Sequence, residues 1–226
     1  MGDGYISDWL RDGERIALHY QERIRKHDLG AKALDWRSEE EGKRFFREGL
    51  TGVDVATVRT VFDVGCGKAD LYPFMLGQGY KLAAYAGIDV VPEFVERARS
   101  DYQTINVRTG NFITFNPAGA RFDLVANFGG LNSRMSHHEA YLEYVIGKMA
   151  GMSARYVAFN VLADAEPGFF PKGNQHTIGH ITDIASDSLR GIVTNVSRSQ
   201  GFKERIRTVQ IFPKCHDVFV VMEKRL

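Results

Sequence analysis

Apolar residues follow different periods along the chain, and these periods predict its helices and strands. Residues 8–27 carry apolar side chains near one helical face with charged residues between them, which predicts an amphipathic helix. A second helix is predicted over residues 38–50, because glutamates fill its first turn, where the helix dipole favours negative charge. From residue 60 onward, short apolar runs bounded by turn residues predict strands with helices between them.

The individual elements can be placed from these runs. Strands are predicted at 60–64, 83–88, 105–109, 122–128, 155–162, 192–197 and 216–222, and further helices at 71–76, 91–99, 139–149 and 181–189. Residues 202–213 are predicted to connect the last two strands. The polar segment 163–179, rich in glycine and proline, is predicted to be a long loop.

A glycine turn follows the first predicted strand. Gly65 and Gly67 allow the backbone to turn sharply, and Asp70 stands at the N-cap position of the next helix. Strand, turn and helix in this order receive a nucleotide-like ligand in an open parallel sheet. A dinucleotide site requires a third glycine where Asp70 stands, and a carboxylate there opposes a diphosphate. With Asp63 at the end of the strand, the pattern favours a cationic ligand.

The spacing of Asp63, Gly65, Gly67 and Ala69 resembles the cofactor loop of the class I S-adenosylmethionine-dependent methyltransferases. The resemblance extends from about Arg59 to Leu162, with alanine in place of the last glycine of the motif. It implies an α/β fold with a Rossmann-like, seven-stranded, mostly parallel sheet flanked by helices and ending in antiparallel strands. It also implies S-adenosylmethionine as cofactor and methyl transfer by in-line displacement.

Asp89 ends the second predicted strand, at the spacing from the glycine turn that is typical of ribose-binding acids. Its carboxylate can accept hydrogen bonds from both ribose hydroxyls, although a helix cap or turn residue is the alternative. The family's adenine-binding acid is replaced by Asn111, which also suits a plain turn. The resemblance implies cofactor contacts from Asp63, Gly65, Cys66, Gly67, Asp89, Val90, Asn111, Phe112 and Asn127.

The end of the fourth predicted strand bears on the methyl acceptor. Residues 127–132 lack the Asn/Asp-Pro-Pro-aromatic motif of methylases that act on exocyclic base amines, and the chain lacks a Pro-Cys pair. The sequence therefore favours a small-molecule acceptor and no DNA, while protein and RNA acceptors stay open. Trp36, Phe128 and His176 are the candidate acceptor-binding residues.

Segments before the first strand often cover the cofactor in this family, which makes Tyr20 and Trp36 candidates for a lid. Ordinary packing aromatics are the alternative. His138 is the candidate general base and Tyr20 the second candidate catalytic residue. Exposed histidines at a helix start are the competing interpretation for residues 137 and 138. No His-Glu-x-x-His spacing indicates a metal site.

Composition agrees with one domain over residues 1–226, with an N-terminal helical cap over 1–52 and a Rossmann-like core over 53–226. The chain is 44% hydrophobic, enough for a sizeable core, and its net charge of +1 gives no overall attraction to nucleic acid or anionic membrane. No apolar run is long enough to span a membrane. Cys66 and Cys215 are expected to be reduced thiols in a cytoplasmic protein. The oligomeric state is not indicated.

Two other functions remain compatible with these patterns. A non-catalytic module that binds S-adenosylmethionine or S-adenosylhomocysteine would carry the same cofactor motifs without an acceptor pocket. An NAD-dependent oxidoreductase is disfavoured by Asp70 and by the glycine spacing.

Overall fold

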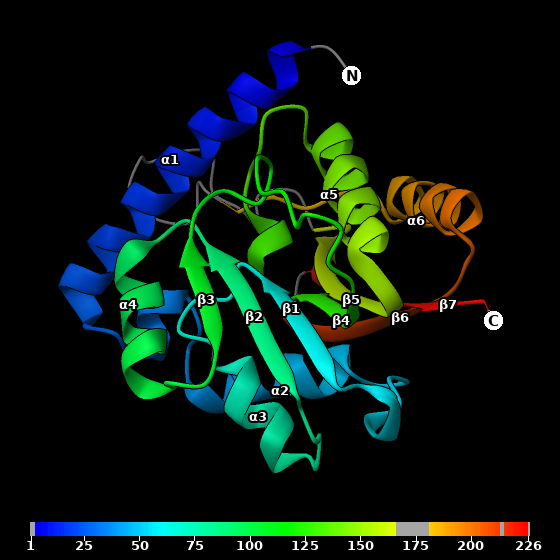
Figure 1. Ribbon diagram of the computed structural model, residues 1–226. Coiled ribbons are helices and arrows are strands. Elements are labelled where there is room, and N and C mark those ends of the chain that lie inside the picture. The colour runs from blue at the N-terminus through cyan, green and yellow to red at the C-terminus, as the bar shows by residue number, and fades with distance from the viewer. Residues whose placement is uncertain (1–2, 166–180, 213–214, 226) are drawn as a thin grey trace.

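The computed structural model describes residues 3–165, 181–212 and 215–225 (Figure 1). The helices are α1 (Asp3–His27), η1 (Ala31–Leu34), α2 (Glu39–Gly49), η2 (Val55–Thr57), α3 (Leu71–Gly77), α4 (Pro92–Asp101), η3 (Gly130–Asn132), α5 (His138–Met152) and α6 (Ser186–Gln200). The strands are β1 (Thr60–Val64), β2 (Ala84–Asp89), β3 (Asn106–Thr109), β4 (Phe122–Asn127), β5 (Ser153–Ala163), β6 (Phe202–Phe212) and β7 (Cys215–Lys224).

The strands form a seven-stranded sheet in the order β3-β2-β1-β4-β5-β7-β6. Strands β1 to β5 are parallel to one another, while β7 is antiparallel to both of its neighbours, β5 and β6. The order reverses at β1, so β1 and β4 diverge toward opposite halves of the sheet. In such sheets ligands bind outside the carboxyl ends of the strands at this point. The predicted Rossmann-like fold class is confirmed.

Helices cover both faces of the sheet, because the central strands are apolar on both sides. On one face, Phe46 of α2, Leu71 of α3 and Val95 of α4 belong to a single buried cluster. On the other face, Leu142 of α5 and Leu189 of α6 belong to the main core cluster. The interior therefore lies in two layers, one on each side of the strands.

Helix α1 lies apart from these two layers. It crosses the carboxyl ends of β2 and β3, where the arrowheads point in Figure 1. Trp9 of α1 is fully buried and Ile16 nearly so, and both join the core cluster that contains α5. The N-terminal helix is thus anchored by apolar contacts above the edge of the sheet where a ligand is expected.

The prediction for the C-terminal part of the chain was wrong for two elements. Residues 192–197, predicted as a strand, lie in α6, and residues 202–212, predicted as a connection, form β6. The buried residues Leu189, Ile192 and Val196 recur at helical spacing, which a run of β-branched residues had obscured. Strand β6 lies at the sheet edge and carries several charged residues, so its apolar alternation is weak.

The ends of three helices bear on the predictions. The helix predicted over 38–50 is α2, and Ser38 caps it, because its side chain accepts a hydrogen bond from the amide of Glu41. Asp70 occupies the N-cap position of α3, but its side chain makes no capping hydrogen bond and lies 3.4 Å from Lys68 Nζ. The helix predicted at 181–189 begins only at Ser186.

Candidate functional site

A cavity of about 450 Å³ lies at the carboxyl ends of β1, β2 and β4, beneath α1. This volume is within the range of small-molecule sites. The sequence-predicted residues that line it are Tyr20, Trp36, Asp63, Gly65, Cys66, Gly67, Asp89, Val90, Asn111, Phe112, Asn127 and Phe128. The fold thus brings residues of the N-terminal helical segment together with residues that follow strands β1 to β4.

The glycine turn has the left-handed backbone conformation that a sharp turn requires. Gly65 and Gly67 have φ angles of +70° and +51°, which glycine adopts without strain. Ala69 also has a positive φ, +61°, at the place where the family motif has glycine. The turn is nevertheless closed, because the Ala69 amide donates to the Cys66 carbonyl over 2.8 Å. The substitution therefore leaves the turn intact at a cost of about 1–2 kcal/mol.

The amides of Gly65, Cys66 and Gly67 donate to groups of the protein itself. Those of Gly65 and Cys66 donate to the Ile88 carbonyl of β2, at 2.8 and 3.1 Å. The Gly67 amide donates to Asp89 Oδ2 at 2.8 Å. A phosphate-binding loop needs its amides for the phosphate oxygens. The groups left to contact a ligand are therefore the carboxylates beside the loop, and carboxylates favour a cationic ligand.

Asp63 ends β1 with only 4% of its surface exposed. The Tyr85 hydroxyl donates a hydrogen bond to Asp63 Oδ2. Burial raises the pKa of Asp63 to about 7; the Tyr85 bond opposes this shift, while the charges of Asp89 and Asp70 add to it. A buried carboxylate of this kind gains most from a cationic partner. The ammonium of S-adenosylmethionine would provide one.

Asp89 lies on the neighbouring strand β2. Its two oxygens accept from the amides of Gly67 and Val91, at 2.8 and 2.9 Å. These bonds lower the pKa of Asp89 less than burial raises it. Each carboxylate oxygen can accept a further hydrogen bond. Asp89 can therefore hold the glycine turn and bind ribose hydroxyls at the same time.

Asn111 follows β3 and is fixed by local structure. Its Oδ1 accepts from the Ile113 amide at 2.9 Å, the turn geometry that was the alternative interpretation. Gly13 of α1 lies so close that an added Cβ there would stand 2.5 Å from Asn111 Nδ2. Phe112 is largely buried, and its carbonyl accepts from Lys148 Nζ at 2.6 Å. Asn111 and Phe112 both line the cavity. Their contact with the adenine ring stays a prediction.

Three asparagine side chains hold the segment after β4 through hydrogen bonds to its backbone or from it to β5. The sequence analysis named only one of them, Asn127, and as a cofactor contact. Asn127 Oδ1 accepts from the Leu131 amide at 3.2 Å. Asn160 Oδ1 accepts from the Gly129 amide, and Asn132 Oδ1 from the Leu162 amide, each at 2.8 Å. Short polar side chains near glycines after a strand were the available signal. They hold this wall of the cavity in one shape.

The segment between α1 and α2 covers the cavity. An added Cβ on Gly67 would meet Leu34 at 3.0 Å, and one on Gly129 would meet the Trp36 ring at 3.4 Å. Leu34 therefore lies over the glycine turn and Trp36 over the end of β4. Phe128 lines the cavity beside them, with its ring centre 5.9 Å from that of Phe46. Trp36 thus stands where a lid was expected.

Tyr20 of α1 lines the same cavity, and its ring centre lies 6.0 Å from that of Phe94. Burial and the nearby carboxylates of Asp35 and Asp89 raise the pKa of Tyr20 far above its ordinary value. The phenol therefore stays protonated and is available as a hydrogen-bond donor rather than as a base. Its place in the reaction stays a prediction.

The other acceptor-side candidates lie elsewhere. His138 does not line the cavity in the described structure, and burial lowers its pKa to about 4. Its ring is 6.4 Å from that of Tyr141, which does line the cavity. His176 falls outside the described residues, as does most of the predicted loop 163–179.

Sequence reasoning missed a cluster formed by His19, Arg23 and Asp35, all of which line the cavity. His19 Nε2 lies 3.3 Å from Asp35 Oδ2, and Arg23 Nε lies 2.8 Å from Asp35 Oδ1. The spacing of His19 and Arg23 on one side of α1 was the available signal, but it gave no hint of Asp35.

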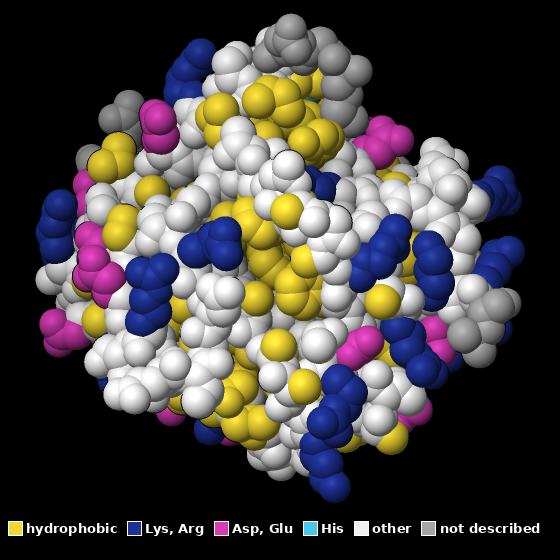
Figure 2. Space-filling view, viewed as in Figure 1, with side chains coloured by type: hydrophobic (Ala, Val, Ile, Leu, Met, Phe, Trp, Pro, Cys, Tyr) yellow, Lys and Arg dark blue, Asp and Glu magenta, His cyan; other side chains and the backbone are white. Residues whose placement is uncertain are grey.

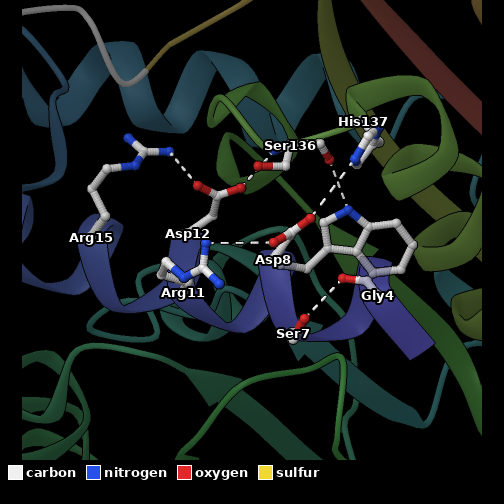
Figure 3. A network of polar contacts seen from close by, with 9 residues as sticks. Gly4, Ser7, Asp8, Arg11, Asp12, Arg15, Ser136 and His137 are labelled. Carbon is white, nitrogen blue, oxygen red and sulfur yellow. Dashed lines mark hydrogen bonds and ion pairs between the residues drawn. The ribbon is translucent and has the colours of Figure 1, made fainter. Parts of the chain in front are cut away.

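Polar contacts fasten the first half of α1 to the segment before α5 (Figure 3). Trp9 Nε1 donates to the Ser136 carbonyl at 2.8 Å, and the Ser136 amide donates to Asp12 Oδ2 at 2.6 Å. Arg15 reaches the carbonyl of Arg134, and His137 stacks on Tyr5 at 4.3 Å. These contacts join the helix above the cavity to residues 134–137, which precede α5.

The charges of the cavity favour a cationic ligand. The acidic residues in its described lining are Asp35, Asp63, Asp70 and Asp89, and the one Lys or Arg is Arg23. Asp35 is paired with Arg23 and Asp70 with Lys68, which leaves Asp63 and Asp89 without a cation. A ligand with a sulfonium and an ammonium group matches this balance.

Comparisons with known proteins agree with this chemistry. Residues 61–149 match the family described as "Methyltransferase domain". The chain is similar to magnesium protoporphyrin IX methyltransferase from Synechocystis PCC 6803 with bound SAM, at 13% identity and a TM-score of 0.61, over 95% of this chain and 97% of that one. A comparison with curated protein sequences returns no significant match.

Two other solved structures show the same architecture. The methyltransferase domain of bacterial CtHen1-C is 13% identical with a TM-score of 0.63, over 82% of this chain and 99% of that one. The N-terminal domain of EvdMO1 with SAH bound is 15% identical with a TM-score of 0.56, over 84% of this chain and 82% of that one. At such identities the likeness is one of fold.

Residues 61–149 therefore match a methyltransferase domain, and the chain has the fold of solved methyltransferases with bound S-adenosylmethionine or S-adenosylhomocysteine. Asp63 and Asp89 are the acidic residues of the described lining that are not paired with a Lys or Arg, which suits a cationic cofactor such as S-adenosylmethionine. No helix of the described residues is long and apolar enough to cross a membrane. Within those residues, no group of three His, Cys, Asp or Glu side chains is arranged to hold a metal.

Proposed function

We propose that the protein methylates a small molecule, which it binds between the cofactor site and the residues Trp36 and Phe128. The cover over the cavity carries this proposal. Leu34 and Trp36 lie on the glycine turn and on the end of β4, so the space beside the cofactor site is roofed by the chain itself. A roofed pocket with aromatic walls excludes water and suits a compact acceptor.

The surface supports a small molecule over RNA. On the face drawn in Figure 2, lysines and arginines are scattered among acidic residues and hydrophobic groups, without a continuous basic stripe. Nucleic-acid-binding proteins concentrate Lys and Arg on one face, because phosphate contacts dominate affinity. One structural neighbour is named for a small-molecule substrate, magnesium protoporphyrin IX, which supports the same direction.

In this proposal the bound cofactor supplies an activated methyl group, and the protein supplies orientation. Asp63 and Asp89 hold the ammonium and ribose ends, and the neutral Tyr20 phenol donates a hydrogen bond beside them. Trp36 and Phe128 position the acceptor. Alignment of two reactants is worth roughly 7–11 kcal/mol in favourable cases.

A non-catalytic module that only binds the cofactor is the competing function. Release of S-adenosylhomocysteine in the presence of a panel of phenols, alcohols, amines and carboxylic acids tests the two against each other. The proposal expects release that depends on one class of small molecule and falls when Trp36 is replaced by alanine. Tight cofactor binding without release by any small molecule would favour the binding module or a macromolecular acceptor.

We also propose that residues 1–52 and 53–226 act as one unit in the cytoplasm. Burial of Trp9 among residues of α5 supports the first point, and the buried free thiol of Cys66 is compatible with the second. Limited proteolysis of the cofactor-bound protein tests the unity of the domain, because a separable cap would be cleaved near residue 52.

A further inference from the structure

Lys148 of α5 holds the turn that follows β3. Its Nζ donates to the carbonyl of Phe112 at 2.6 Å and to the carbonyl of Ile113 at 2.8 Å. The same Nζ lies 4.9 Å from the centre of the Phe112 ring and 5.9 Å from that of Tyr144. The Tyr144 hydroxyl also donates to the Ile113 carbonyl, at 3.2 Å. Two side chains that lie four residues apart on one helix therefore bind the same turn.

The charge of Lys148 is held by neutral groups. Within the described structure it forms no ion pair, and burial lowers the pKa of its ammonium. The two carbonyls and the aromatic rings therefore compensate the charge in place of a carboxylate. Hydrogen bonds from an ionised donor are stronger than those between neutral groups. The ammonium thus fixes the two carbonyls more firmly than a neutral side chain would.

The turn that Lys148 holds is part of the cavity wall. Asn111 and Phe112 belong to the described lining, whereas Lys148 does not. The Phe112 carbonyl and the Ile113 amide form one planar peptide group. Lys148 binds the oxygen of this group, and Asn111 Oδ1 accepts from its nitrogen at 2.9 Å. The side chain of Asn111 and the ammonium of Lys148 are therefore coupled through a single peptide group.

The same turn lies next to the residue placed for the cofactor ribose. Its first amide, that of Gly110, donates to the Asp89 carbonyl at 2.8 Å. Strands β1, β2 and β3 are successive neighbours in the sheet, about 4.8 Å apart. In the proposed function Asp63 on β1 meets the ammonium of the cofactor, and Asp89 on β2 meets its ribose. Since the base and the sulfonium lie on opposite sides of the ribose, the base then reaches the turn after β3.

We propose that Lys148 is a positioning residue that makes the site selective for an adenine base, acting through the turn it holds. This inference rests on the proposed function, because it needs an adenosyl cofactor in the cavity. Asn111 Oδ1 can accept a second hydrogen bond, and the 6-amino group of adenine supplies a donor. A base with a carbonyl in that place would leave both oxygens without a donor. Without Lys148 the peptide group turns, and Asn111 no longer distinguishes the two bases.

The test compares two ligands that differ only in the base. S-inosylhomocysteine carries a carbonyl where S-adenosylhomocysteine carries the 6-amino group, and calorimetry measures the affinity of each. The wild-type protein should prefer S-adenosylhomocysteine by roughly 10-fold or more, because the other base leaves a buried acceptor unpaired. Lys148→Met should lose most of this preference, through weaker binding of S-adenosylhomocysteine. A purely structural role would weaken both ligands equally and keep the preference, and that result would overturn the proposal.

Lys224→Met is the matched control. Lys224 Nζ donates to the Gln200 carbonyl at 2.5 Å and lies 4.5 Å from the centre of the Phe202 ring, contacts of the same kind outside the described cavity lining. This variant should be less stable to heat and keep both affinities. If Lys148→Met does not fold, Tyr144→Phe removes only the hydroxyl bond to the same turn and should lower the preference by a smaller factor. An unchanged preference in folded Tyr144→Phe would then overturn the proposal.

These outcomes separate two kinds of failure. If the wild-type protein does not bind S-adenosylhomocysteine, the proposed function fails and this inference fails with it. If the wild-type protein binds it tightly and Lys148→Met keeps the same preference, only the role of Lys148 fails. Equal affinity of the wild-type protein for both ligands would mean that the turn does not distinguish the bases, which would also overturn the inference.

Discussion

Burial of Asp63 makes the stability of the cofactor-free protein depend on pH. The carboxyl is 4% exposed, and burial raises its pKa from 3.8 to about 7. Between these values the folded protein binds more protons than the unfolded chain, so stability falls as the pH rises. The contribution is fully present below the unfolded pKa and is lost once the pH passes the folded pKa. Replacement of Asp63 by asparagine removes this loss, because the amide oxygen still accepts from Tyr85 without a charge.

The magnitude follows from the two pKa values. A shift from 3.8 to about 7 corresponds to roughly 4 kcal/mol at 1.36 kcal/mol per unit. Relaxation around the ionised group reduces this upper value, and we expect Asp63→Asn to gain about 2–4 kcal/mol at pH values above 7. For a chain of this size the gain corresponds to a rise of roughly 5–15 °C in Tm. Near the unfolded pKa the two proteins should be equally stable.

Thermal unfolding of both proteins across the neutral range, with and without S-adenosylmethionine, measures the effect. Burial also raises the pKa of Asp217 to about 7, and that group titrates in both proteins, so the difference between them isolates Asp63. The cofactor should stabilise the wild-type protein and hardly affect Asp63→Asn. The same pH dependence in both proteins, or an equal stabilisation by cofactor, would refute the reasoning.

Three further substitutions test other parts of the site. Gly67→Val should abolish cofactor binding in a folded protein, because its Cβ would stand 3.0 Å from Leu34 at a φ of +51°, and calorimetry showing wild-type affinity would contradict this. Asp89→Ala should weaken S-adenosylmethionine roughly 10- to 100-fold and a 2′,3′-dideoxyribose analogue far less, and equal losses would mean that Asp89 acts through structure. Trp9→Phe removes the bond to the Ser136 carbonyl, which should cost about 1–3 kcal/mol and speed amide hydrogen exchange in α1; unchanged exchange would mean that this bond does not hold the helix.

The parallel half of the fold could be predicted from sequence because its signals are local. Strand β1 is a continuous apolar run, and glycines with a following helix mark its end. The antiparallel end could not be predicted as well. Val193 and Val196 carry strand-forming side chains but are buried on a helical face, and only packing against the sheet decides between the two. Charged residues on β6 are tolerated because it is an edge strand, which a sequence does not reveal.

The positions of the predicted cofactor-binding residues in the cavity lining follow from local signals for the same reason. Asp63 and Asp89 lie in the last two residues of adjacent parallel strands, so their positions follow from the strands alone. Other parts of the lining depend on contacts between distant segments. Asp35 meets His19 only because the turn after η1 folds back on α1, and Asp35 itself adopts a left-handed backbone conformation. His138 lies near the start of α5, as the sequence indicates, but it is not part of the described cavity lining.

The central claim is that this cavity transfers a methyl group from S-adenosylmethionine to a small molecule. The most direct measurement follows radioactive methyl groups from the cofactor into the filtrate and the macromolecular fraction of a cell extract treated with the purified protein. Label in a compound of the filtrate, lost with the Gly67→Val variant, is the predicted result. Label confined to protein or RNA, or no transfer at all from a cofactor that binds tightly, would contradict the account.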